Sequence, residues 1–129
     1  MSRLLAAVLL LLASTVFAQE PEFEMTTYQV AFLKSAPNRP QLPKEEAARI
    51  QAAHMAHIGA MAKSGKLVLA GPFADGGALR GMFVFTCGEA EAKQLGEADP
   101  AVKAGLLVLE WHPWYSAKGI GILKGEQKK

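Results

Sequence analysis

The sequence predicts an α+β domain of the ferredoxin-like type, in the order strand, helix, strand, strand, helix, strand. Its 129 residues are enough for one hydrophobic core. Segments with alternating apolar residues flank two segments with helical spacing, and turns rich in glycine or proline separate them. In this split β-α-β order, both helices lie on one face of a four-stranded antiparallel sheet.

The first strand and the loop after it are predicted over residues 27–43. Tyr28, Val30 and Phe32 alternate with other residues, and their aromatic and β-branched character favours a strand over residues 27–34. Apolar side chains fall on both faces, so we expect this strand to be central. Residues 35–43 contain three prolines, which predicts a loop.

A long helix is predicted over residues 44–64. Its first turn carries two glutamates, where the helix dipole favours negative charge, and Gly65 is placed to end it. At about 100° of rotation per residue, four apolar residues form a stripe with His54 at its centre: Ala47, Ile50, Ile58 and Met61. A titratable imidazole therefore faces the side that the helix is expected to bury.

The second half of the chain supplies the other elements. Residues 66–70, 82–87 and 106–114 are predicted strands, with Pro113 ending the last one. The glycines and proline of residues 71–81 predict a hairpin-like connection. Residues 89–96 form a predicted short helix, and Asp99 and Pro100 have the residue types of a helix cap and a first helical position.

Residues 1–18 have the features of a cleaved secretory signal peptide. Arg3 gives a positive start, an unbroken apolar run follows, and Ala18 ends a stretch typical of a cleavage site. The apolar run is short of the roughly 20 residues of a spanning helix, although an uncleaved anchor is the alternative. We therefore expect a secreted or periplasmic protein without membrane attachment. Its parts would be a disordered lead-in over residues 19–25, a domain over 26–116 and a flexible basic tail over 117–129.

Charge and cysteine content restrict the partners. Loss of residues 1–18 removes Arg3 and lowers the formal net charge from +2 to +1. This near-neutral chain argues against nucleic acid as a partner, because phosphate binding needs a clustered basic surface. Cys87 is the single cysteine, so no intrachain disulfide is expected.

His54 and Asp99 are the candidate catalytic residues. A carboxylate that accepts a hydrogen bond from one imidazole nitrogen fixes the tautomer and makes the other nitrogen more basic, so that it can move a substrate proton. The two residues are far apart in sequence, and spacing alone does not establish their contact. The alternatives are a core histidine bonded to a backbone carbonyl and an aspartate that only caps a helix.

A metal site is the less favoured use of the histidines. His54 and His57 are three residues apart on the predicted helix and could reach one ion. His57 lies about 60° from the centre of the stripe, so we interpret it as a surface histidine. No metal and no organic cofactor is expected.

A homodimer is the expected assembly. Both faces of the strands carry apolar residues, so the sheet face away from the helices needs cover, and a second copy of the sheet is the simplest cover. Trp111, Trp114 and Tyr115 gather at the end of the last strand. They could line an apolar pocket, or, as we expect, close the dimer interface.

The sequence resembles the YciI-like (YCII-related) family between Tyr28 and Trp114. The resemblance is carried, in order, by His54 and by residues 65–72, 98–105 and 111–114. It implies a dimeric α+β barrel of ferredoxin-like subunits and a His-Asp pair that falls on His54 and Asp99. A similar class of proteins removes chloride from chlorinated hydroxyquinols, and the same barrel hosts lactone isomerases and small monooxygenases.

The expected function is therefore that of an exported small-molecule enzyme. His54 and Asp99 would supply general acid/base chemistry of a dehydrohalogenase, lyase or isomerase type on a small cyclic or aromatic compound. The alternative is a non-catalytic exported dimer that binds a ligand or acts as a scaffold. The secretory leader, the proline-rich loop and the basic tail differ from the usual small cytoplasmic member of the family.

Overall fold

The computed structural model of the chain describes residues 24–119. The expected signal peptide, residues 19–23 of the lead-in and residues 120–129 of the tail lie outside this range. The helices and strands within it are, in chain order, β1 (Met25–Ser35), α1 (Lys44–Lys63), β2 (Leu67–Pro72), β3 (Leu79–Phe85), α2 (Glu89–Glu97), α3 (Pro100–Lys103) and β4 (Leu107–Ala117). None of these helices is both long and apolar enough to cross a membrane.

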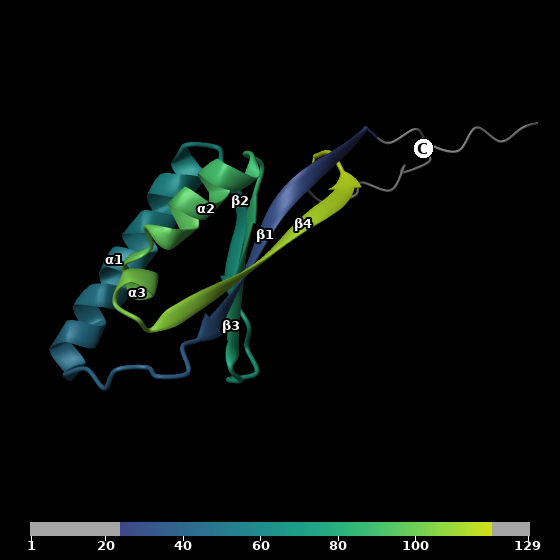
Figure 1. The fold of residues 1–129 in the computed structure, drawn as a ribbon. Helices are drawn as coiled ribbons and strands as arrows, with labels where there is room; N and C mark the ends of the chain where they lie inside the picture. Colours follow the sequence, from purple (N-terminus) through teal and green to yellow (C-terminus); the bar gives the residue numbers. More distant parts are fainter. Residues whose placement is uncertain (1–23, 120–129) are drawn as a thin grey trace, which may run out of the picture.

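The predicted fold class is confirmed. The strands form one four-stranded antiparallel sheet in the order β2-β3-β1-β4, so that β1 is central as expected. All three helices of the described residues lie on the same side of this sheet (Figure 1). Each β-α-β unit is split by a strand of the other unit, which is the ferredoxin-like arrangement.

The last strand is longer than the sequence predicted. Pro113 does not end it: β4 continues to Ala117, and Pro113 pairs with Gln29 of β1. The reason is the position of β4 at the edge of the sheet, since a proline is tolerated there when its missing N–H would point away from the neighbouring strand.

The sheet separates two apolar clusters. Side chains on the helix side form the main core, which consists of Ala31, Leu33, Met61, Leu67, Phe83, Phe85 and Ala92. The other face carries Tyr28, Val30 and Val84, with Phe32 and Met82 packed against them; we call it the open face. The alternation along β1 that predicted a central strand is thus confirmed, because successive side chains enter different clusters.

The tryptophans of β4 point to different faces. The Trp111 ring packs in the helix-side core, with its centroid 5.7 Å from that of Phe85. The Trp114 ring lies 5.9 Å from that of Tyr28, in the cluster of the open face. The expectation that Trp111 joins Trp114 at a dimer interface is therefore wrong, because residues an odd number apart on a strand face opposite ways.

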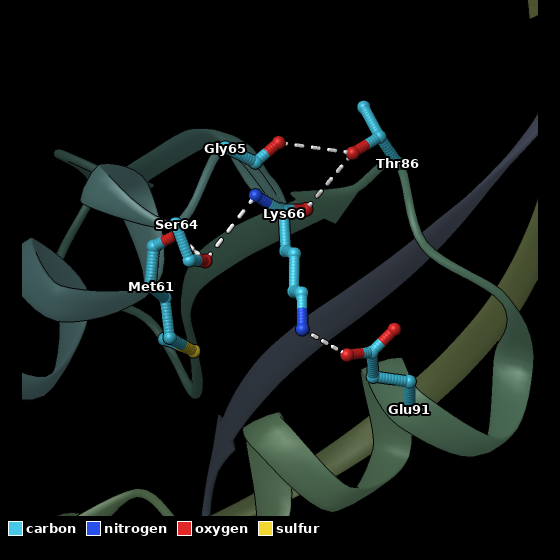
Figure 2. A network of polar contacts seen from close by, with 6 residues as sticks. All are labelled: Met61, Ser64, Gly65, Lys66, Thr86 and Glu91. Carbon is cyan, nitrogen blue, oxygen red and sulfur yellow. Dashed lines mark hydrogen bonds and ion pairs between the residues drawn. The ribbon is translucent and has the colours of Figure 1, made fainter.

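Figure 2 shows the polar contacts that connect the end of α1 to the sheet and to α2. Gly65 ends the helix with φ of 75°, a conformation that favours glycine. The Thr86 hydroxyl donates to the Gly65 carbonyl at 3.1 Å, and the backbone N–H of Lys66 faces the Ser64 hydroxyl oxygen at 3.4 Å. The Lys66 ammonium pairs with the Glu91 carboxylate, which raises the pKa of Lys66. These contacts help to fix the direction in which α1 crosses the sheet.

Candidate active site

His54 lies on the packed side of α1, as its place on the apolar stripe predicted. The imidazole is largely covered, with 12% of the side chain exposed. Its ring stacks over Phe83 of β3, with centroids 6.3 Å apart and planes inclined by 26°. The helix thus holds the imidazole between its own axis and the sheet.

Asp99 reaches the same place from the end of the second helical segment. It precedes α3, where Pro100 takes the first helical position as predicted, and the Asp99 side chain accepts a hydrogen bond from the backbone N–H of Ala101 at 2.8 Å. The side chain is completely buried. Its role as a helix cap is therefore confirmed, and it leaves the second carboxylate oxygen for another donor.

That donor is His54. The imidazole Nδ1–H donates to the Asp99 Oδ2 atom at 2.7 Å, so the two sequence-predicted residues are in direct contact. A buried carboxylate that holds Nδ1–H leaves the lone pair on Nε2, and it also stabilises the imidazolium that forms when Nε2 takes up a proton. The pair can therefore accept and return a proton.

A cavity of about 300 Å³ opens beside the pair. Its walls come from α1, from the neighbouring ends of β2 and β3, and from the turn between α3 and β4. The apolar side chains of its lining include Leu33, Met55, Ile58, Phe83 and Leu107. His54 belongs to this lining, so the imidazole that contacts Asp99 also borders a space that a small ring can enter.

Three polar side chains of the cavity were not predicted from the sequence: Arg39, Gln51 and Arg80. Gln51 lies one helical turn before His54 (i, i+3), and this spacing could have revealed it. Arg39 lies in the proline-rich loop and Arg80 at an irregularity of β3. No periodic pattern marks either position.

The remaining histidines have other roles. The His57 Nε2–H donates to the Leu95 carbonyl of α2 at 2.8 Å and is partly buried, so this residue joins two helices and is not the surface histidine we expected. His112 lies on the open face, 2.9 Å from a carboxylate oxygen of Glu110. Within residues 24–119, no group of three or more His, Cys, Asp and Glu side chains is arranged to hold a metal ion.

Cys87 is a partly covered thiol two residues after the end of β3. Burial raises its pKa, and the nearby Glu91 carboxylate adds to this rise. The sulfur therefore stays protonated and poorly nucleophilic, and the side chain packs against the helix-side core.

Comparison with known proteins identifies the family. The model of the YCII-related domain matches residues 28–114, and the chain belongs to this family. Among solved structures, the chain is similar to the 5-chloro-2-hydroxyhydroquinone dehydrochlorinase of Burkholderia phenoliruptrix in complex with 2,5-dihydroxybenzoquinone. The TM-score is 0.50 at 19% identity, over 69% of this chain and 93% of that one. This likeness supports the fold. No curated protein matches the chain.

The hydrogen bond between His54 and Asp99 can be tested by replacing the carboxylate with an amide. In Asp99→Asn, the amide oxygen can keep the bond from Ala101 N–H, and the amide NH₂ then faces His54 Nδ1. Because this nitrogen must now accept, we expect the neutral imidazole to change from the Nδ1–H to the Nε2–H tautomer. Imidazole ¹⁵N shifts, recorded in alkaline solution, measure the change.

His57 serves as the internal control in the same spectra, because its bond to the Leu95 carbonyl is untouched. Its tautomer should not change. An Nε2–H tautomer for His54 already present in the unsubstituted protein would contradict the assigned hydrogen bond.

Proposed function

We propose that this protein is a small-molecule enzyme in which His54, held by Asp99, acts as a general acid/base on a cyclic or aromatic compound in the cavity beside it. One observation carries the proposal: the imidazole that donates to a completely buried carboxylate at 2.7 Å also lines a cavity of about 300 Å³. The opening beside the imidazole is what distinguishes this pair from a histidine and a carboxylate enclosed in solid packing.

The chemistry follows from the free imidazole nitrogen. Nε2 accepts a proton from the bound ring, and the Asp99 carboxylate stabilises the imidazolium. The electron pair left on the ring can form a new double bond and expel a neighbouring chloride with its bonding pair, which is an elimination. Alternatively, this electron pair shifts a double bond within the ring, and the imidazolium returns the proton to a different ring atom, which is an isomerisation.

Membership of the YCII-related family is compatible with this chemistry, and the similar solved structure is that of a dehydrochlorinase in complex with 2,5-dihydroxybenzoquinone. Because the two chains are only 19% identical, we infer the substrate class from the cavity of this protein and not from that enzyme. The apolar wall of the cavity suits a flat ring. A non-catalytic ligand-binding dimer is the alternative that the following experiment decides.

Replacing His54 by Gln should lower turnover by about 10² or more, as loss of a general acid/base does, while ligand binding persists. The assay follows chloride release from a panel of chlorinated hydroxyquinols, and binding of 2,5-dihydroxybenzoquinone is measured in parallel.

His57→Gln is the matched control, since the glutamine amide can still donate to the Leu95 carbonyl and His57 does not line the cavity. It should retain turnover. Equal turnover in His54→Gln and the unsubstituted protein, with unchanged ligand affinity, would support the non-catalytic alternative.

We also propose that two copies pair through the open face. This face carries a second, mainly apolar hollow of about 380 Å³, whose lining includes Phe32, Leu69, Met82 and Trp114. Leu69 is 44% exposed and Trp114 is 46% exposed in the single chain. Large apolar side chains exposed together on one sheet face are the usual mark of an interface.

Leu69→Glu should convert the dimer to a monomer, because it would bury a carboxylate in an apolar interface. Sedimentation velocity of the full chain measures the mass. Met55→Glu, which changes an even more exposed apolar residue on α1, should leave the dimer intact. A monomer for the unsubstituted protein would contradict this pairing.

A further inference from the structure

The cavity beside His54 is positively charged at its edge. Its ionisable lining consists of two arginines, Arg39 and Arg80, together with His54, and no carboxylate side chain lines it within the described residues. No carboxylate of residues 24–119 forms an ion pair with either arginine. Two arginines therefore line a space that holds no protein anion to balance them, and the Arg80 guanidinium also donates from Nη1 to the Gly77 carbonyl at 3.4 Å.

Arg80 lies at a bulge in β3, at the edge of this cavity. Leu33 pairs with Gly81 and the next residue of β1, Lys34, pairs with Leu79, which leaves Arg80 as an extra residue in the strand. With regular alternation, Arg80 would share the open face with Met82, but a bulge changes the direction of the side chain it carries. Arg80 instead belongs to the cavity lining on the helix side.

The proline-rich loop brings Arg39 to the same cavity. The loop is anchored where the Ala36 N–H donates to the Leu106 carbonyl at 3.1 Å, and Pro40 lies close to Gly105 in the turn before β4. A proline restricts its own φ and the conformation of the residue before it, which here is Arg39. The loop thus limits the positions that the Arg39 backbone can take at the mouth of the cavity.

We propose, resting on the proposed function for the use of this cavity, that its ligand is a small ring bearing a carboxylate, which Arg39 and Arg80 bind while the ring lies against Phe83 near His54. The planar guanidinium matches a carboxylate in shape and can donate two hydrogen bonds to it. A volume of about 300 Å³ is at the lower end of ligand pockets, so it suits one ring better than an extended chain.

This assignment gives the two arginines a role in specificity. A carboxylate fixed at the mouth of the cavity sets which ring atom reaches the imidazole. Both arginines are exposed, so the attraction acts partly through solvent and should weaken with added salt. Binding of an uncharged ring of equal shape should not depend on salt.

The experiment measures equilibrium binding of benzoate, salicylate and 2,5-dihydroxybenzoate to the full chain, each against its uncharged carboxamide, by calorimetry or NMR. We expect at least one carboxylate to bind about tenfold more tightly than its amide, the effect of a charge-assisted hydrogen bond. Arg39→Gln and Arg80→Gln should each remove part of this preference, and the double variant should remove it.

Arg49→Gln is the matched control, because Arg49 is an exposed arginine of α1 outside the cavity lining. It makes the same change of net charge and should leave the preference intact. Equal affinity for carboxylate and amide, no detectable binding of any carboxylate, or equal losses in Arg49→Gln and Arg80→Gln would overturn the assignment.

The carboxylate preference of the cavity and the catalytic role of His54 can be tested separately. A carboxylate preference that depends on Arg39 and Arg80, in a protein whose turnover is unaffected by His54→Gln, would retain the ligand class and remove the catalytic role. Loss of turnover in His54→Gln with equal binding of carboxylates and amides would retain the catalytic role of His54 and remove the proposed ligand class.

Discussion

The buried carboxylate of Asp99 is the group on which the site depends. A carboxylate cannot be removed from water without partners that replace its hydration, and both of its oxygens have one: Oδ1 accepts from Ala101 N–H at 2.8 Å and Oδ2 from His54 Nδ1–H at 2.7 Å. The first bond starts α3 and the second ties that helix to α1. The Asp99 side chain therefore stabilises the fold and also orients the imidazole of His54.

Much of the architecture could be predicted from the sequence because it follows from local periodicity. The stripe around His54 predicted α1, and the alternation in β1 predicted a central strand. The interpretation of Asp99 and Pro100 as the start of a helix needed only their residue types. The prediction that Pro113 ends the last strand was wrong, because a proline is tolerated in a strand at the edge of a sheet. The order of the strands decides which of them lies at an edge, and local sequence does not reveal that order.

The residues that line the site were harder to predict from the sequence, because their positions depend on departures from regular periodicity. The bulge that holds Arg80 is defined by the pairing between β1 and β3, and the position of Arg39 is defined by the contact of a loop with the turn before β4. The contact between His54 and Asp99 joins residues 45 positions apart. The resemblance to the YCII-related family suggested that pair, whereas residue spacing gave no measure of the distance between its members.

A crystal structure of the full chain with a bound ring ligand such as 2,5-dihydroxybenzoate would test the role of His54 most directly. We expect a ring in the cavity with one of its atoms within about 3.2 Å of His54 Nε2, the reach of a general base, while Nδ1–H still donates to Asp99. A ligand bound away from His54, or an imidazole and carboxylate pointing into separate surroundings, would contradict it.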